Sequence, residues 1–487
     1  MPKTFTDADA ARLSAVAKDA LNRYRLPGLA VGVVSGESLV YAEAFGFADI
    51  ETGRSQDPAL RQRIGSITKT MVALCAMALI DEGRLSLSDR LADHIPELVF
   101  HGDGSGITIR HLLTHTSGIG EVAMAEDVRD TQGSLWSSEP DLNVLGLFPR
   151  GLTVDVPPGS KWSYANLAYA LLGEIVARLE GAPIAEVVRR RVFAPLGMTN
   201  SDLLDLPHPD LTTGYHVAPG ADERELSARA GIEIPDEPTV DGHNIRGQFL
   251  HIRGGGAAGA VQSTVPDMGR YAAALLRGGG GIVRPETFAA MTSPQWEPDE
   301  RLESWGLGVS RDVRFGRRLF GHGGGVLGGW NSMLLVMPDE DLALIIHANS
   351  YAYEAFAKLE SRLLATLLDA GPPPDLGPVA PEILAAAPGV YEAGLGKLTN
   401  VRINVGTGRL QIKADEDGLM LHARRGPWKN GVRLHPADPE DPGFFHLADD
   451  DLEPTRLALI RDGAGRVTGL RHTLVEMVRT DQVPGWV

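Results

Sequence analysis

The spacing of hydrophobic positions near the start of the chain changes from a helical period to a strand period. Residues 7–24 show the spacing of an amphipathic helix, and Pro27-Gly28 ends the connection that follows it. Residues 29–34 and 39–47 have strand character, and a short polar turn joins them. The pattern therefore predicts a helix followed by a β-hairpin.

Farther along the chain the pattern becomes helical and then returns to strands. Prolines and glycines punctuate residues 66–195, and the apolar run over residues 70–80 predicts a buried helix. Later strands are expected over residues 305–311, 319–321, 332–337 and 342–348, and a closing helix over residues 353–368. Because strands at both ends enclose helices, we expect an α+β fold. Its sheet is built from both ends of this part and flanked by helices, with a helical lobe inserted in the middle.

The last part of the chain has a different pattern. Gly371-Pro372-Pro373-Pro374 and two later prolines predict a stiff linker over residues 371–382. Short alternating segments separated by Gly, Asn and Asp turns follow, and they predict a small antiparallel β-barrel of about eight strands. Its strands are expected to include residues 401–405, 410–412, 419–421 and 457–460. We therefore expect two domains, residues 1–370 and residues 383–487.

Composition and charge narrow the classes of partner. The 487 residues are 43% hydrophobic and 22% charged, which is typical of a globular protein. The net charge of −17 argues against nucleic acid and anionic membrane, because both attract basic surfaces. Cys75 is the only cysteine, so no intramolecular disulfide can form. The absence of an apolar secretory core and of a membrane-spanning run predicts a cytoplasmic protein and leaves a homodimer open.

Ser66 and Lys69 are the first candidate catalytic residues. Nowhere else in the chain does a lysine lie three residues after a serine. On the first turn of a helix the two side chains would share a face. A serine hydroxyl needs an adjacent base to become a nucleophile, and a desolvated lysine can serve as that base. The alternative is an exposed serine and a surface lysine with no shared role.

Tyr164 and Asn166 open a predicted helix that runs through Leu179. A phenol beside Lys69 could accept the Ser66 proton or relay it to a leaving group. Asn166 could hold Lys69 through its oxygen and a substrate carbonyl through its nitrogen. The alternative is that both residues only cap the helix.

Three successive glycines, Gly323, Gly324 and Gly325, follow His322 in a predicted strand. Glycines weaken a strand, and close approach of a ligand is the usual reason for them. An edge strand of this kind could pair with a peptide-like substrate through Gly323 and Gly324. The Gly325 N–H would join the Ser66 N–H in an oxyanion hole, and His322 would point into the cleft beside Tyr164.

His111 and His115 are four residues apart and could in principle bind a metal. No Glu or Cys stands where a zinc hydrolase would need one. We therefore expect these histidines to hydrogen-bond a turn near the cleft, and we expect neither a metal nor a cofactor.

Three motifs in order resemble those of the penicillin-recognising serine hydrolases: Ser66-x-x-Lys69, Tyr164-x-Asn166 and His322-x-Gly324. That family comprises class C β-lactamases, DD-peptidases, D-aminopeptidases and family VIII carboxylesterases. The resemblance implies a β-lactamase-like antiparallel sheet and Ser66 as the acylated nucleophile. It further implies Lys69 and Tyr164 as general bases and Gly325 as an oxyanion donor. The barrel resembles the lipocalin-like domains appended to D-aminopeptidases.

His322 departs from the β-lactamase pattern, which has a lysine at that position. Histidine there is similar to the D-aminopeptidase and DD-peptidase pattern, so the resemblance implies weak β-lactam turnover. The D-aminopeptidases that the chain resembles use such a domain to restrict the cleft. We therefore expect a barrel loop near Tyr164 and His322, with residues 424–428 and 439–442 as candidates. The alternative is an independent module for dimerisation or solubility.

The leading functional interpretation is a hydrolase that forms a Ser66 acyl-enzyme and cleaves a small amide or peptide bond, with D-residues among the candidate substrates. A carboxylesterase acting on short-chain esters uses the same residues, and a non-catalytic penicillin-binding sensor or scaffold would keep the fold alone. An α/β-hydrolase is excluded because no Gly-x-Ser-x-Gly motif occurs. The expected partner is therefore a small ester, amide or peptide.

Overall fold

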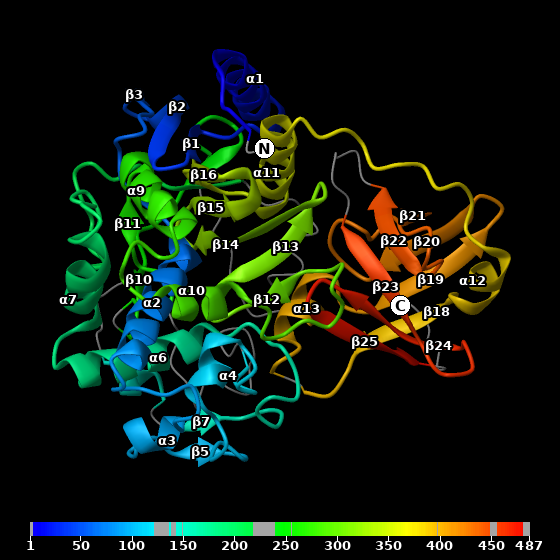
Figure 1. Ribbon diagram of the computed structural model, residues 1–487. Coiled ribbons are helices and arrows are strands. Elements are labelled where there is room, and N and C mark those ends of the chain that lie inside the picture. The colour runs from blue at the N-terminus through cyan, green and yellow to red at the C-terminus, as the bar shows by residue number, and fades with distance from the viewer. Residues whose placement is uncertain are drawn as a thin grey trace.

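The computed structural model shows a sheet domain with a helical lobe and, beside it, a β-barrel (Figure 1). The residues that the structure describes are 3–120, 136–137, 143–148, 150–217, 239–254, 256–396, 398–448 and 455–480.

The main sheet has eight antiparallel strands in the order β12-β13-β14-β15-β16-β1-β2-β3. Pairing of Leu29 with Ala348 joins the N-terminal hairpin to β16, the last strand of this sheet along the chain. The predicted sheet built from both ends of this part is thus confirmed. Its strands are β1 (Gly28–Ser35), β2 (Ser38–Asp49), β3 (Arg54–Ser55), β12 (Ser304–Trp305), β13 (Ser310–Arg314), β14 (Arg317–Val326), β15 (Trp330–Met337) and β16 (Leu342–Ala348).

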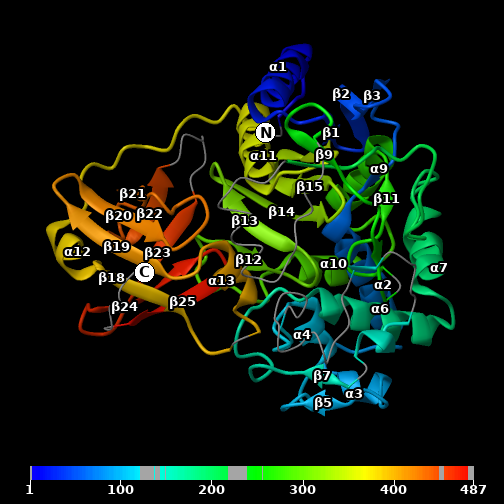
Figure 2. The same cartoon turned by 180° about the vertical axis from the view of Figure 1, so that it is seen from behind.

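Helices cover both faces of this sheet (Figures 1 and 2). Because side chains alternate along a strand, Leu29 and Val31 pack with α1 and α11, while Ala30 belongs to the core that contains α2 and α9. Nearly all of α2 is buried, as expected for a helix that is apolar all round. These helices are α1 (Asp7–Tyr24), α2 (Thr68–Asp81), α9 (Val265–Leu276), α10 (Pro285–Thr292) and α11 (Tyr353–Leu368).

The helical lobe is inserted between β4 and β11, which pair with each other. Its helices are α3 (Leu91–His94), α4 (Ile109–Leu113), α6 (Asn166–Glu180) and α7 (Ile184–Val188). Short strands complete the domain: β4 (Gln62–Arg63), β5 (Phe100–His101), β6 (Trp136–Ser137), β7 (Leu152–Thr153), β8 (Tyr215–Val217), β9 (Asn244–Arg246), β10 (His251–Ile252), β11 (Gln262–Ser263) and β17 (Ser350–Tyr351).

The C-terminal part forms a closed eight-stranded antiparallel barrel, which confirms that prediction. Its interior is filled by side chains such as Tyr391, Phe445 and Leu470. The strands are β18 (Gly389–Ala393), β19 (Leu410–Asp415), β20 (Gly418–Ala423), β21 (Val432–Pro436), β22 (Phe444–Ala448), β23 (Arg456–Arg461), β24 (Val467–His472) and β25 (Val475–Thr480).

One predicted barrel strand is wrong. Residues 401–405 form a helix, α13 (Val401–Gly406), in the connection between β18 and β19. The barrel closes without this segment, and Ile403 packs against the barrel core from outside the strand ladder. A five-residue alternation fits a short helix as well as a strand, and here the tertiary context decides.

Residues 371–380 connect the domains without a regular element, and α12 (Pro381–Ala386) then packs on the barrel through Ile383. Among the helices that the structure describes, none is both long enough and apolar enough to cross a membrane.

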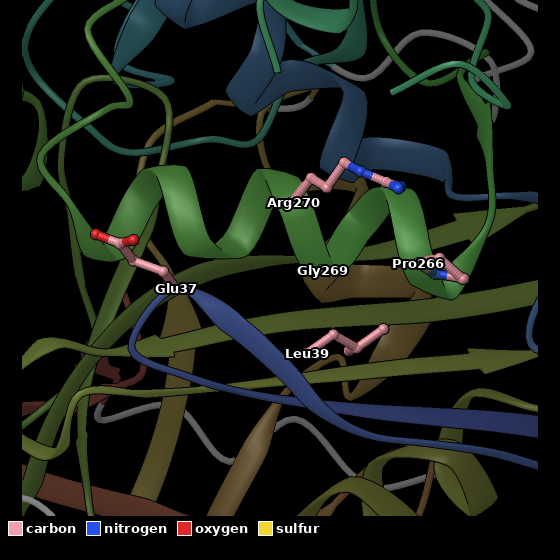
Figure 3. A pocket seen from close by; sticks show the side chains of 5 residues that line it. All are labelled: Glu37, Leu39, Pro266, Gly269 and Arg270. Carbon is pink, nitrogen blue, oxygen red and sulfur yellow. The ribbon is translucent and has the colours of Figure 1, made fainter. Parts of the chain in front are cut away.

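A small pocket lies between the start of β2 and α9 (Figure 3). It is lined by Glu37, Leu39, Pro266, Gly269 and Arg270. None of these residues belongs to the three motifs, so the pocket is separate from the candidate catalytic residues.

Candidate active site

Ser66 lies in a single 3₁₀ turn, Gly65–Ile67, which runs directly into α2. The chain just before it is tied to the main sheet. The Gln62 side-chain amide donates to the Asn331 carbonyl at 2.9 Å, and the Ser332 hydroxyl donates to the Ile64 carbonyl at 2.8 Å. These bonds hold the serine beside the start of β15, which pairs with the end of β14.

Glycines in β14 allow this approach of two backbones. A Cβ on Gly324 would lie 2.0 Å from the Ile64 oxygen. Gly65 has φ +53°, and a Cβ there would lie 2.8 Å from the Gly325 nitrogen. Close packing against the protein's own chain therefore requires Gly324, whereas the sequence had suggested approach of a ligand.

Replacing Gly324 by alanine should destabilise the protein by about 1–3 kcal/mol, because the new Cβ overlaps backbone and forces Ile64 away. Gly323→Ala is the matched control, since its Cβ would meet only the flexible end of Met333 at 3.1 Å. Urea unfolding of both variants tests this. Equal stabilities would contradict the packing argument.

The Lys69 ammonium lies at the centre of the candidate site. Its Nζ is 2.9 Å from Ser66 Oγ and 2.8 Å from Asn166 Oδ1, and it also donates to the Ala258 carbonyl. The residue is fully buried. Its Nζ lies 5.0 Å from the centre of the Tyr164 ring. The structure thus brings together the serine, lysine, tyrosine and asparagine that the sequence singled out.

An aromatic cluster holds the Tyr164 ring. His115 lies against it with ring centres 4.2 Å apart, and the His115 Nδ1 accepts from the Ala165 N–H at 3.1 Å. Burial, followed by the Lys69 charge, lowers the pKa of His115 well below its usual value. Trp305, from β12, lies 6.1 Å from the same ring. His115 therefore fixes a turn beside the site, as expected.

His111 lies apart from this cluster and accepts from the Thr108 N–H at 3.2 Å at the start of α4. Among the described residues, no group of three or more His, Cys, Asp and Glu side chains could hold a metal.

His322 is buried beside Tyr164, with ring centres 6.0 Å apart. Its Nδ1 donates to the Gly323 carbonyl at 2.6 Å, because a carbonyl can only accept. Burial and, second, the Lys69 charge lower the pKa of His322 to about 3. The ring is therefore neutral at pH 7, with Nε2 as an acceptor.

The predicted edge position holds for the three glycines but not for the rest of their strand. β14 lies inside the sheet, because β12 and β13 continue it on the far side. In the described part of the chain, β13 pairs with β14 only as far as Gly321, while β15 pairs along the glycines to Val326. Only the end of β14 beyond Gly321 resembles an edge.

The barrel reaches the site through the segment before and within α13, and both cartoon views place α13 on the barrel side that faces the sheet domain (Figures 1 and 2). The Arg402 guanidinium lies 4.8 Å from the centre of the Tyr164 ring. Asp441, in the second of the two turns suggested from the sequence, pairs with Arg301 of the sheet domain at 3.0 Å.

Sequence reasoning missed Trp305 and Arg402 at the site. Trp305 was only the first residue of an expected strand, and no motif marks it. Arg402 was assigned to a barrel strand, so nothing placed it near a tyrosine more than two hundred residues earlier.

Comparison with known proteins gives the class of this protein. Its main sheet is flanked by helices, and the buried Lys69 lies beside Ser66. The family model described as Beta-lactamase matches residues 13–368, so the chain belongs to the beta-lactamase family of serine hydrolases.

Among relatives, the chain is 34% identical to esterase EstB of Burkholderia gladioli over 254 residues, which cover 50% of this chain and 62% of the esterase. The octameric penicillin-binding protein homologue of Pyrococcus abyssi is 22% identical with a TM-score of 0.61, over 96% of this chain and all of that one. D-amino acid amidase of Ochrobactrum anthropi SV3 is 21% identical with a TM-score of 0.60, over 74% and 99%. At these identities the two structures are evidence of fold alone.

Proposed function

We propose that this protein forms an acyl-enzyme on Ser66 and hydrolyses a small amide or peptide bond. The observation that carries the proposal is the fully buried Lys69, whose Nζ lies 2.9 Å from the Ser66 hydroxyl oxygen. A buried amine in contact with a hydroxyl can accept its proton when the amine is neutral, and the hydroxyl then becomes a nucleophile.

The remaining steps are assigned to the residues around this pair. Ser66 Oγ attacks the substrate carbonyl while Lys69 and Tyr164 share the proton path. The N–H groups of Ser66 and Gly325 stabilise the oxyanion. The position of the Gly325 nitrogen beside Gly65 supports this role. Tyr164 returns the proton to the leaving amine, and water then releases the acyl group by the same route in reverse.

Asn166, Gly323 and Gly324 are proposed to bind the substrate. The Asn166 oxygen accepts from Lys69 at 2.8 Å, and the Asn166 amide nitrogen is proposed to donate to the substrate carbonyl. His322 is proposed to act beside Tyr164 as a neutral acceptor. A neutral ring gives the third motif no positive charge, which supports an amide or peptide substrate over a β-lactam.

A carboxylesterase is the second candidate. The observation that favours it is the 34% identity to an esterase over 254 residues. An ester needs the same nucleophile and oxyanion hole, but its leaving group depends less on a proton donor.

Parallel assays on D-alanine 4-nitroanilide, 4-nitrophenyl butyrate and a chromogenic cephalosporin test the proposal. We expect turnover of the anilide and, for the cephalosporin, kcat/KM lower by about 100-fold or more. L-alanine 4-nitroanilide is the stereochemical control. Turnover of the butyrate without the anilide would favour the esterase, and stoichiometric acylation without turnover of any substrate would indicate a penicillin-binding sensor.

A further inference from the structure

The barrel places a positive charge beside the candidate site. We call the region between Tyr164 on one side and Tyr351 on the other the mouth of this site. Arg402 is exposed, yet its guanidinium lies 4.8 Å from the centre of the Tyr164 ring. The same ring lies 5.0 Å from Lys69 Nζ. Arg402 and Lys69, the residue that contacts Ser66, therefore both lie near the Tyr164 ring.

The other wall of the mouth is also close to Arg402. A Cβ on Gly325 would lie 3.1 Å from the Tyr351 ring, so Tyr351 borders the proposed oxyanion hole. Burial raises the pKa of Tyr351, and the Arg402 charge opposes that rise. The guanidinium is thus within electrostatic range of both walls.

The segment that carries Arg402 is held firmly against the loop that carries Tyr164. Asp155 accepts from the Thr399 N–H and hydroxyl, each at 2.8 Å. Ser163 donates to the Thr399 carbonyl at 3.1 Å. Leu398 is only 6% exposed and belongs to the core of the sheet domain. These contacts set the position of the arginine before any substrate arrives.

We propose that Arg402 is a substrate-binding residue supplied by the C-terminal barrel, and that it binds a carboxylate of the substrate at the mouth of the site. A guanidinium presents a planar pair of donors that matches a carboxylate. On a chain of net charge −17, a local cation is also needed to attract an anion. His322 is neutral and Lys69 is buried against Ser66, so neither supplies that charge to the mouth.

This inference rests on the proposed function, because the carboxylate must belong to a molecule that Ser66 attacks. The carboxylate can lie on the acyl group or on the leaving group. Two matched ester pairs separate these sources: 4-nitrophenyl butyrate with mono-4-nitrophenyl succinate for the acyl side, and phenyl butyrate with 3-butyryloxybenzoate for the leaving side.

Arg402→Gln should lower kcat/KM for the carboxylate member of one pair by about 10-fold or more, and for its neutral partner by less than about 3-fold. Arg402→Lys keeps the positive charge but not the planar pair of donors, and it should recover part of the lost kcat/KM. Arg466→Gln removes the same charge from an exposed turn between β23 and β24 and should change neither pair. Equal losses of kcat/KM for the charged and the neutral ester would mean that Arg402 only holds the barrel against the sheet domain, and would overturn the proposal. No loss for either ester would also overturn it.

A second measurement keeps the two proposals separable. Calorimetry measures the binding of 3-butyryloxybenzoate and of mono-4-nitrophenyl succinate to two variants, Ser66→Ala and Ser66→Ala/Arg402→Gln. This measurement requires no turnover. Weaker binding of either carboxylate to the double variant supports the arginine even if Ser66 proves not to be acylated. Unchanged binding of both carboxylates overturns the proposal for Arg402, whether or not Ser66 is acylated.

Discussion

Ser66→Ala is expected to abolish turnover and covalent labelling while leaving the fold intact. The loss in kcat should be at least about 10³-fold, because the variant has no nucleophile to form the acyl-enzyme. Stability should change little, since Lys69 keeps its bonds to Asn166 and the Ala258 carbonyl. Intact-mass spectrometry after exposure to a fluorophosphonate measures the labelling.

Ser160→Ala is the matched control for this experiment. Ser160 is an exposed serine in the turn before Tyr164, and its hydroxyl donates to the Pro157 carbonyl at 2.6 Å. This variant should be labelled like the unaltered protein. A label that persists in Ser66→Ala would show that another residue is the nucleophile.

Lys69→Met and Tyr164→Phe should each lower kcat by at least about 100-fold, because each removes one group from the proton path. Their effects should not add in the double variant, since the two residues act as a unit. Lys69→Met should also lower stability, because it leaves the buried Ala258 carbonyl without its donor. Tyr164→Phe keeps the ring contacts to His115 and Arg402 and should fold normally.

Tyr169→Phe serves as the control for the tyrosine. The Tyr169 ring also lies near Lys69, 5.6 Å from Nζ, but its hydroxyl donates to the Leu113 carbonyl at 3.1 Å. This variant should melt at a lower temperature with kcat nearly unchanged. Full additivity of the Lys69 and Tyr164 losses in steady-state kinetics would mean that the two groups serve separate steps.

The local pattern of hydrophobic, polar and turn residues was sufficient to predict much of the fold. The β1-β2 hairpin follows from two strand-like runs around a polar turn, and α2 follows from an apolar run too short for a membrane. The barrel follows from regularly spaced turns. Each of these signals lies within a few residues of the element it predicts, so no knowledge of distant contacts was needed.

Local signals carry no information about distant contacts, and this explains where the predicted fold differs from the structure. The alternation over residues 401–405 is too short to separate helix from strand, and packing of Ile403 on a barrel that is already closed decides for the helix. The glycines of β14 suggested an edge strand. They do lie beyond the last residue that pairs with β13, but β12 and β13 continue the sheet alongside the first half of β14. Neither fact is encoded near the residues concerned.

For the candidate site, the sequence by itself determined the pairing of Ser66 with Lys69, because residues that are three positions apart at the start of a helix lie on the same face. The tertiary structure alone decided what surrounds that pair. It brings Tyr164 and Asn166 from the helical lobe, Trp305 and His322 from the sheet, and Arg402 from the barrel. These residues are far apart along the chain, and only the packing of the lobe, the sheet and the barrel against one another, through contacts such as Asp155 with Thr399, gives them a common position.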